Sequence, residues 1–231
     1  RGCNRAIASS KIIKDKMKIV EKFISIDGEG PTAGGLSVFI RFAGCNLHCA
    51  WCDTCYAQKE YSYTEDLTVP QIVDYVRSTG VKHVTITGGE PLLQKDLREL
   101  LSALDFVTIH IETNGSINIE PYRMGSHVNF VVDYKLPGSK MEHLMCLENF
   151  TAVKPNDAYK FVIADAKDMA LAVSLVKEYN LINKTQVFFS TVFGEISPAD
   201  VVEVMKKENL NGVRLQLQLH KFIWDKNKRG V

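Results

Sequence analysis

The sequence has no run of 18 or more apolar residues, which is the length that a transmembrane helix needs. It also has no excess of charge of either sign, because 28 Lys and Arg residues against 27 Asp and Glu residues give a formal net charge of +1. A charge this close to zero provides no general attraction to nucleic acid or to a membrane surface. The content of 45% hydrophobic and 24% charged residues is typical of a folded globular protein. We therefore expect a protein that binds neither nucleic acid nor membrane.

The first 16 residues lack the apolar core of a signal peptide. They precede Met17, which resembles a natural start. We therefore expect residues 1–16 to be an N-terminal extension or a vector-derived remnant, and residues 17–231 to form one domain. Without a secretory signal, the clustered cysteines favour metal binding in a reducing compartment, the cytoplasm, over disulfide bonds.

Short β-branched or aromatic segments alternate with amphipathic segments along the rest of the chain. This alternation predicts parallel βαβ units, and about six of them follow the cysteine-rich loop. The predicted strands are 18–26, 37–44, 83–88, 107–115, 128–135, 159–163, 186–192 and 213–219. The predicted helices are 69–80, 91–104, 166–180 and 197–210. The sequence contains no linker and no low-complexity segment, so the pattern predicts a single-domain α/β protein, an incomplete (β/α) barrel.

Four polar or glycine-rich segments each follow a predicted strand. They are the cysteine loop at 45–55, "TGGEP" at 87–91, "ETNG" at 112–115 and "DYKLPGS" at 133–139. The functional loops of such sheets follow the carboxyl ends of the strands. We therefore expect all four segments to meet on one face of the domain.

Cys45, Cys49 and Cys52 form a C-x3-C-x2-C pattern, and Cys55 follows three residues later. A [4Fe–4S] cluster normally takes four thiolates, so three would leave one iron open for a ligand. A structural zinc site is one alternative, although zinc sites usually draw ligand pairs from two separate places. A closed electron-transfer cluster that uses Cys55 is another, but the spacing differs from that of bacterial ferredoxins. The spacing gives no role to Cys3 or Cys146.

The C-x3-C-x2-C pattern with Trp51 before its last cysteine, followed by "TGGEP", resembles the radical S-adenosylmethionine (SAM) superfamily. The resemblance implies that SAM binds the open iron of a [4Fe–4S] cluster and is cleaved to a 5′-deoxyadenosyl radical. Glycines allow the backbone to approach a ligand closely, and a glutamate can accept a hydrogen bond from the SAM ammonium group. The resemblance implies these SAM-contacting residues: Trp51, Cys52, Asp53, Gly88, Gly89, Glu90, Glu112, Asn114, Asp133, Tyr134 and Lys135.

The segment "ISIDGEGPTAGGLSVFIRFAGCNLHCAWCDT" and the ending "LQLHKFIWDKNKRGV" resemble the 7-carboxy-7-deazaguanine synthases, with a match from Met17 to Val231. This family implies a ring contraction of 6-carboxy-5,6,7,8-tetrahydropterin with loss of ammonia, on the route to queuosine. It also implies Mg²⁺, with Thr54 as its protein ligand, because Mg²⁺ takes few protein oxygens. The implied substrate contacts are Ile26, Asp27, Gly28, Glu29, Arg41, Thr87, His220 and, through a terminal carboxylate if the chain ends there, Val231. The family more often has Gln at the position of Asp27.

Each assignment has a structural alternative. Arg41 could form a strand-end ion pair, and Asp133 and Lys135 could pair with each other. Asp27 and Glu29 could shape a turn. Trp51 could only shield the cluster from solvent, and His220 could have no role. A glycyl-radical activating enzyme is the rival function, and it would need no pterin-binding residues. A metal-binding module without catalysis is the other. The resemblance further implies a flavodoxin or ferredoxin-type reductant and a homodimer.

Overall fold

The computed structural model describes residues 16–225 and 228–231, so residues 1–15 of the expected extension, with Cys3, lie outside the described residues. Its strands are β1 (Met17–Ile26), β2 (Leu36–Phe42), β3 (Glu65–Leu67), β4 (His83–Gly88), β5 (Thr108–Thr113), β6 (Val128–Tyr134), β7 (Ala158–Ile163), β8 (Gln186–Thr191) and β9 (Val213–Gln216). Its α-helices are α1 (Val69–Thr79), α2 (Leu97–Ala103), α3 (Asn149–Ala152), α4 (Ala166–Glu178), α5 (Pro198–Lys207) and α6 (His220–Ile223). Its 3₁₀ turns are η1 (Cys55–Ala57), η2 (Pro91–Leu93), η3 (Glu120–Tyr122), η4 (Pro137–Ser139), η5 (Glu142–Leu144) and η6 (Leu181–Asn183).

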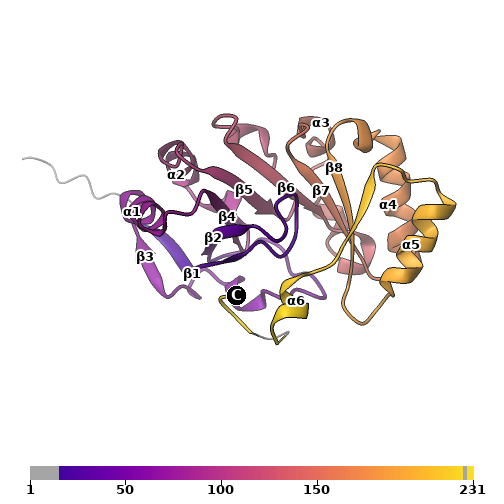
Figure 1. The fold of residues 1–231 in the computed structure, drawn as a ribbon, viewed down its shortest axis with the longest axis horizontal. Helices are drawn as coiled ribbons and strands as arrows, with labels where there is room; N and C mark the ends of the chain where they lie inside the picture. The colour runs from indigo at the N-terminus through magenta and orange to yellow at the C-terminus, as the bar shows by residue number, and fades with distance from the viewer. Residues whose placement is uncertain (1–15, 226–227) are drawn as a thin grey trace, which may run out of the picture.

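Within the described residues the strands form one nine-stranded sheet in the order β3-β1-β2-β4-β5-β6-β7-β8-β9. Neighbouring strands from β2 to β9 are parallel, whereas β1 pairs antiparallel with both β2 and β3. Since β3 and β9 are its two edges, the curved sheet does not close on itself. The helices flank it, with α1 and α2 at one end and α4 and α5 at the other (Figure 1). The architecture is the predicted incomplete barrel of α/β units.

The helix boundaries follow local capping chemistry. The α1 helix ends at Gly80, which has a positive φ of 70° and is the predicted C-cap. The α5 helix begins after Ser197, whose hydroxyl accepts a hydrogen bond from the Ala199 amide. The predictions for α1, α4 and α5 are therefore confirmed to within three residues at each end.

Two predicted elements differ in the structure. The helix predicted at 91–104 is divided into η2 and α2, because Gln94 is extended and its side-chain amide donates to the Ala43 carbonyl. The strand predicted at 213–219 ends at Gln216, because the Leu219 amide turns to donate to the Gly28 carbonyl at 3.1 Å. In both places a contact with a distant segment overrides the local pattern.

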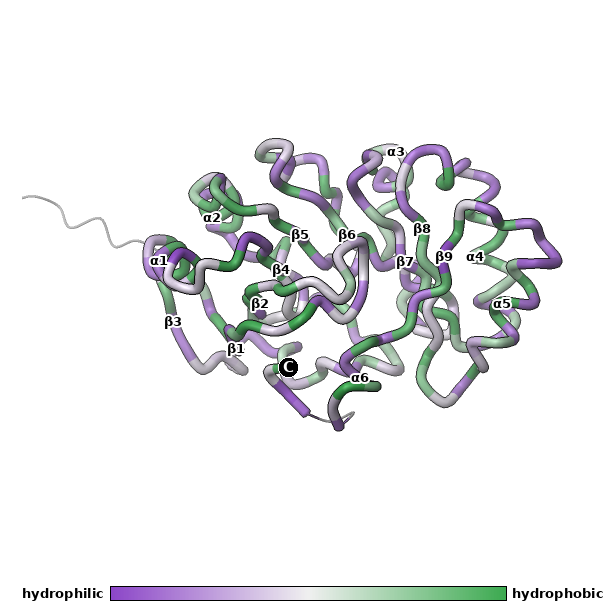
Figure 2. Tube along the Cα trace, viewed as in Figure 1, coloured by the Kyte–Doolittle hydropathy of each residue, from purple (hydrophilic) through white to green (hydrophobic). Residues whose placement is uncertain are grey.

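The core lies between the sheet and the helices. Figure 2 shows hydrophobic stretches along the strands and alternating hydrophilic and hydrophobic stretches along α4 and α5. Phe130, Phe161 and Phe189 are fully buried and lie on the neighbouring parallel strands β6, β7 and β8. No helix in the described part of the chain is long and apolar enough to cross a membrane.

Candidate active site

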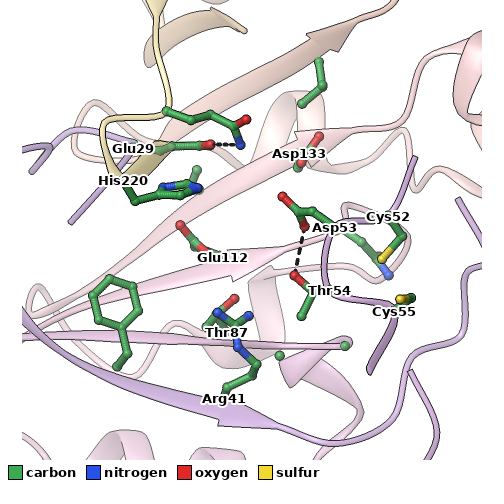
Figure 3. A pocket seen from close by; sticks show the side chains of 18 of the residues that line it. Glu29, Arg41, Cys52, Asp53, Thr54, Cys55, Thr87, Glu112, Asp133 and His220 are labelled. Carbon is green, nitrogen blue, oxygen red and sulfur yellow. Dashed lines mark hydrogen bonds between the residues drawn. The ribbon is translucent and has the colours of Figure 1, made fainter. Parts of the chain in front are cut away.

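A cavity of about 700 Å³ opens at the carboxyl ends of the parallel strands. All four polar segments predicted to converge contribute to its wall, and so do the start and the end of the domain. Figure 3 shows that Arg41, Glu112 and Asp133, from three different strands, and Glu29, from the turn after β1, surround one space. The volume is in the range of small-molecule sites that bury most of a ligand.

Cys45, Cys49 and Cys52 line this cavity as free, half-buried thiols, whereas Cys55 is exposed. The loop that carries them is held by two backbone bonds of 2.8 Å, from Gly44 to Ala57 and from Cys45 to Gln58. Cys55 begins the η1 turn that closes the loop. Cys55 also lies on the cavity wall, and it differs from the other three in its exposure and in its place at the start of η1.

These thiols have the surroundings that a cluster site requires. Burial raises the pKa of Cys45 and Cys49, which keeps free thiols protonated. The Leu47 amide lies 3.4 Å and the Asn114 side-chain amide 3.7 Å from the Cys45 sulfur. The Lys135 ammonium partly offsets the effect of burial on the pKa of Cys49. Such donors stabilise thiolates bound to iron.

No three Cys, His, Asp or Glu side chains in residues 16–225 and 228–231 are arranged to hold a single metal ion. A cubane cluster takes each thiolate on a different iron, so it does not need the three sulfurs to meet around one ion. The three thiols on one cavity wall are compatible with such a cluster.

Gly88 packs on the backbone of Phe42 at the end of β2, and Gly89 packs on Gly44 and Cys45 where the cysteine loop begins. The Gly89 amide donates to Phe42 at 3.0 Å and the Glu90 amide to Gly44 at 2.8 Å. A Cβ at Gly89 would lie 2.1 Å from the Gly44 carbonyl oxygen and 2.9 Å from the Cβ of Cys45. Only glycine therefore permits this contact, and both glycines line the cavity.

Glu90 lies outside the cavity wall, in contrast to the expectation that its carboxylate faces the SAM ammonium. It is 0% exposed and accepts hydrogen bonds from Leu92 N at 3.0 Å, Thr113 Oγ1 at 2.9 Å and Asn114 N at 2.7 Å. Burial raises its pKa to about 7. In this structure Glu90 joins the ends of β4 and β5, which positions Asn114 beside Cys45.

Tyr134 also lies outside the cavity wall. Its ring is buried in the core, with its centroid 5.3 Å from that of Phe150 and 5.8 Å from that of Phe161. Alternation along β6 explains this, because Asp133 faces the cavity and the next side chain must face the opposite side of the sheet. The Tyr134 side chain therefore points away from the cavity in which SAM is expected to bind.

The remaining predicted residues line the cavity, and several of the structural alternatives hold there as well. Asp133 pairs with Lys135 at 2.9 Å, yet its Oδ1 is buried with no partner among the described residues. Asp27 accepts from the Thr32 hydroxyl at 2.6 Å and so also shapes the turn after β1. Burial raises the pKa of Glu112 to about 7.

Arg41 is fixed on the wall by its cross-strand neighbour Glu21, to which its Nε donates at 2.7 Å. The Tyr56 hydroxyl donates to the same Glu21 oxygen at 2.9 Å. The Arg41 Nε is thereby occupied, whereas the outer guanidinium nitrogens face the cavity beside Thr87 and Thr54 (Figure 3). The predicted ion pair is present, and it positions the guanidinium rather than removing it from the cavity.

Thr54 donates its hydroxyl proton to Asp53 Oδ1 at 2.9 Å (Figure 3). The lone pairs of the Thr54 oxygen therefore remain available to a cation. Although burial opposes it, this hydrogen bond and the nearby Lys221 ammonium hold the pKa of Asp53 below its usual value.

The end of the chain closes one side of the cavity. A Cβ at Gly28 would lie 2.5 Å from Nδ1 of His220, so the turn after β1 packs directly on the first residue of α6. Val231 lines the cavity together with Arg229, whose guanidinium lies 3.9 Å from the ring centroid of Tyr56.

Sequence reasoning missed many lining residues, and those with polar or charged side chains include Glu21, Tyr56, Lys160, Gln218, Lys221 and Arg229. Lys160 carried a usable signal, because it is the one charged side chain of an otherwise uncharged β7. Tyr56 lies in the three-residue turn η1, and Gln218 and Arg229 lie in irregular segments, so no periodic pattern marks the inward face.

Comparison with known proteins agrees with this site. The profile of the Radical SAM superfamily matches residues 39–124, which carry the three cysteines and the two glycines. A protein of Clostridium acetobutylicum named 7-carboxy-7-deazaguanine synthase is 49% identical over 219 residues, which cover 93% of this chain and 99% of the relative. One of the same name from Chlorobaculum tepidum is 36% identical and covers 93% of this chain and 97% of the relative.

The chain belongs to the 7-carboxy-7-deazaguanine synthase family of radical SAM enzymes. The crystal structure of QueE from Escherichia coli shares its fold, with a TM-score of 0.69 at 22% identity over 89% of this chain and 95% of that one. Family membership confirms the resemblance drawn from the cysteine loop and the "TGGEP" segment. It implies that a [4Fe–4S] cluster and SAM are the cofactors of this site.

Proposed function

We propose that this protein is a 7-carboxy-7-deazaguanine synthase that contracts the ring of 6-carboxy-5,6,7,8-tetrahydropterin with loss of ammonia. The name of its relatives supports the product, and one observation on this chain supports the substrate. The three thiols line the same cavity as the Glu29 carboxylate and the Arg41 guanidinium. A carboxylate complements the donor edge of an aminopyrimidinone ring, and a guanidinium complements a carboxylate.

When bound, the cluster and SAM supply a 5′-deoxyadenosyl radical. In our proposal the chain's residues hold and orient the reactants. Cys45, Cys49 and Cys52 hold the cluster, and the backbone of Gly88 and Gly89 lets SAM approach it. The other side chains proposed to contact SAM are Trp51, Asp53, Glu112, Asn114, Asp133 and Lys135.

Substrate recognition is assigned to the turn after β1 and to Arg41. The pterin ring is contacted by Ile26, Asp27, Gly28 and Glu29. The Arg41 guanidinium binds the pterin carboxylate through its forked pair of N–H donors. Thr87, His220 and Val231 complete this side of the cavity.

Mg²⁺ is assigned to Thr54. Its hydroxyl donates to Asp53, so its oxygen can bind a cation, with substrate and water oxygens as further ligands. The ion would then lie near the Arg41 guanidinium, where it would help to hold the pterin carboxylate. We further propose a flavodoxin or ferredoxin-type reductant, a homodimer and a cytoplasmic location, as the family resemblance implies.

A matched pair of variants tests the assignment of the cysteine loop. Thr54→Ala should retain about four irons per chain but lose the stimulation of turnover by Mg²⁺, because only its hydroxyl is removed. Cys55→Ser should retain both the irons and the Mg²⁺ response, because Cys55 is the exposed residue of the closing turn. Iron analysis and turnover titrated with MgCl₂ measure these properties. Loss of iron in Cys55→Ser, or an unchanged Mg²⁺ response in Thr54→Ala, would contradict the assignment.

A further inference from the structure

Lys160 lies on the inner face of β7, in the middle of the cavity wall. Alternation along β7 turns Lys160 and Val162 to the cavity and places Phe161 in the core. The parallel register of β6 and β7 puts Asp133 directly beside Lys160. The Lys160 side chain is only 13% exposed, so its ammonium group must find partners inside the site.

The partners of Lys160 are carboxylates. Its Nζ donates to Glu29 Oε2 at 2.6 Å and lies 3.5 Å from Asp133 Oδ2. Burial would lower the pKa of Lys160, but the carboxylates of Glu29, Asp133 and Glu112 raise it well above its usual value. Lys160 is therefore a permanent cation in a wall that contains several acidic side chains.

Glu29 is held from a second side by Gln218. The Gln218 side-chain amide donates to Glu29 Oε1, and Lys221 in turn donates to the Gln218 carbonyl oxygen. One carboxylate oxygen thus contacts Lys160 and the other contacts Gln218, with one further lone pair on each oxygen left for a ligand. Figure 3 shows this carboxylate beside His220 and above Glu112.

We propose that Lys160 is a positioning residue for the substrate, which together with Gln218 fixes the Glu29 carboxylate in the orientation that reads the pterin ring. This inference rests on the proposed function. Without the ammonium group, Glu29 would share a poorly solvated wall with Asp27, Glu112 and Asp133. A carboxylate in that position would turn away or take up a proton, and a protonated carboxyl would present a donor to the donor edge of the ring.

The experiment compares Lys160→Met, Lys160→Arg and Gln218→Leu with the wild-type protein after anaerobic reconstitution of the cluster. Lys177→Met is the matched control, because Lys177 pairs with Glu208 at 2.7 Å on the exposed face of α4. Steady-state turnover of carboxytetrahydropterin yields kcat and KM for each protein. Iron content, thermal unfolding and reductant-driven SAM cleavage without the pterin are measured on the same samples.

Lys160→Met should raise the KM for the pterin by about 10- to 100-fold, as expected for a lost charged hydrogen bond, with a smaller effect on kcat. Lys160→Arg should recover part of the loss, and Gln218→Leu should raise KM by a smaller factor. Iron content should stay at wild-type levels in all of them. Pterin-free SAM cleavage should fall far less than kcat/KM for the pterin, because Asp133 keeps its ion pair with Lys135 at 2.9 Å when Lys160 is replaced. Every property of Lys177→Met should stay at wild-type levels. If Lys160→Met does not fold, the other two variants carry the test.

An unchanged KM in the folded variants would overturn the inference. So would an equal loss of pterin-free SAM cleavage, because Lys160 would then act on the cofactor side of the cavity. Failure of the wild-type protein itself to convert the pterin would be a distinct result that overturns the proposed function, and this inference with it.

Discussion

Gly89→Ala should damage the cluster site by sterics alone. The added Cβ would lie 2.1 Å from the Gly44 carbonyl oxygen and 2.5 Å from its carbonyl carbon, whereas real Cβ contacts are essentially never under 3.0 Å. The atoms must therefore separate by roughly 0.9 Å, the difference between these two distances. Backbone atoms cannot rotate away as a flexible side chain would.

The neighbouring hydrogen bonds determine what this displacement does. Gly44 O accepts from Glu90 N at 2.8 Å, and Cys45 N donates to Gln58 at 2.8 Å. Moving Gly44 strains the first bond and shifts Cys45, a proposed cluster ligand. Overpacking of this kind costs about 1–3 kcal/mol, which lowers Tm by about 2–4 °C per kcal/mol in a domain of this size.

The assay measures Tm of the iron-free protein and iron content after anaerobic reconstitution. Gly80→Ala is the control, since Gly80 has a φ of 70° with nothing within 4 Å of its added Cβ. The control should lose about 1 kcal/mol from its left-handed backbone and keep its iron. A Gly89→Ala protein with wild-type Tm and full iron content would refute the reasoning.

Two further changes test the cavity wall. Between pH 4.5 and 7 the stability of the wild-type protein should fall relative to that of Glu112→Gln by up to about 3 kcal/mol, because the pKa of Glu112 in the folded protein is about 7 and its ordinary value is 4.5, so only the unfolded carboxyl ionises in this window. A constant difference in urea unfolding from pH 5 to pH 8 would contradict the burial of this carboxyl. Glu21→Gln should raise the KM for the pterin about five-fold while SAM cleavage is unchanged, because it weakens the ion pair that positions Arg41; an unchanged KM would show that Arg41 needs no such support.

Much of this site follows from strand order alone. The predicted strands and the rule that functional loops follow their carboxyl ends place the cysteine loop, Gly88, Glu112 and Asp133 around one cavity. The proposed division of the cysteines into three ligands and a bystander rests on their spacing together with the resemblance to the radical SAM superfamily. These features are local in sequence or repeat with a fixed period, so they can be read without coordinates.

What the sequence did not predict depends on contacts between distant segments. Glu90 sits in a motif that suggests a ligand contact, but three donors from η2, the end of β5 and the residue after it occupy its carboxylate. The position of the Tyr134 side chain in the core follows from the alternation of side chains along β6, which has to be continued to the last residue of that strand. Lys160 and Gln218 meet Glu29 across separations of 131 and 189 residues, and no local pattern indicates such a pairing.

Product formation tests the central claim most directly. The protein is reconstituted anaerobically and supplied with SAM, a reductant, Mg²⁺ and 6-carboxy-5,6,7,8-tetrahydropterin. We expect a deazaguanine chromophore together with one ammonia per product, and a protein that carries about four irons. Unchanged pterin from a protein that holds its cluster and cleaves SAM would contradict the account, most clearly if a partner enzyme gained a glycyl radical instead.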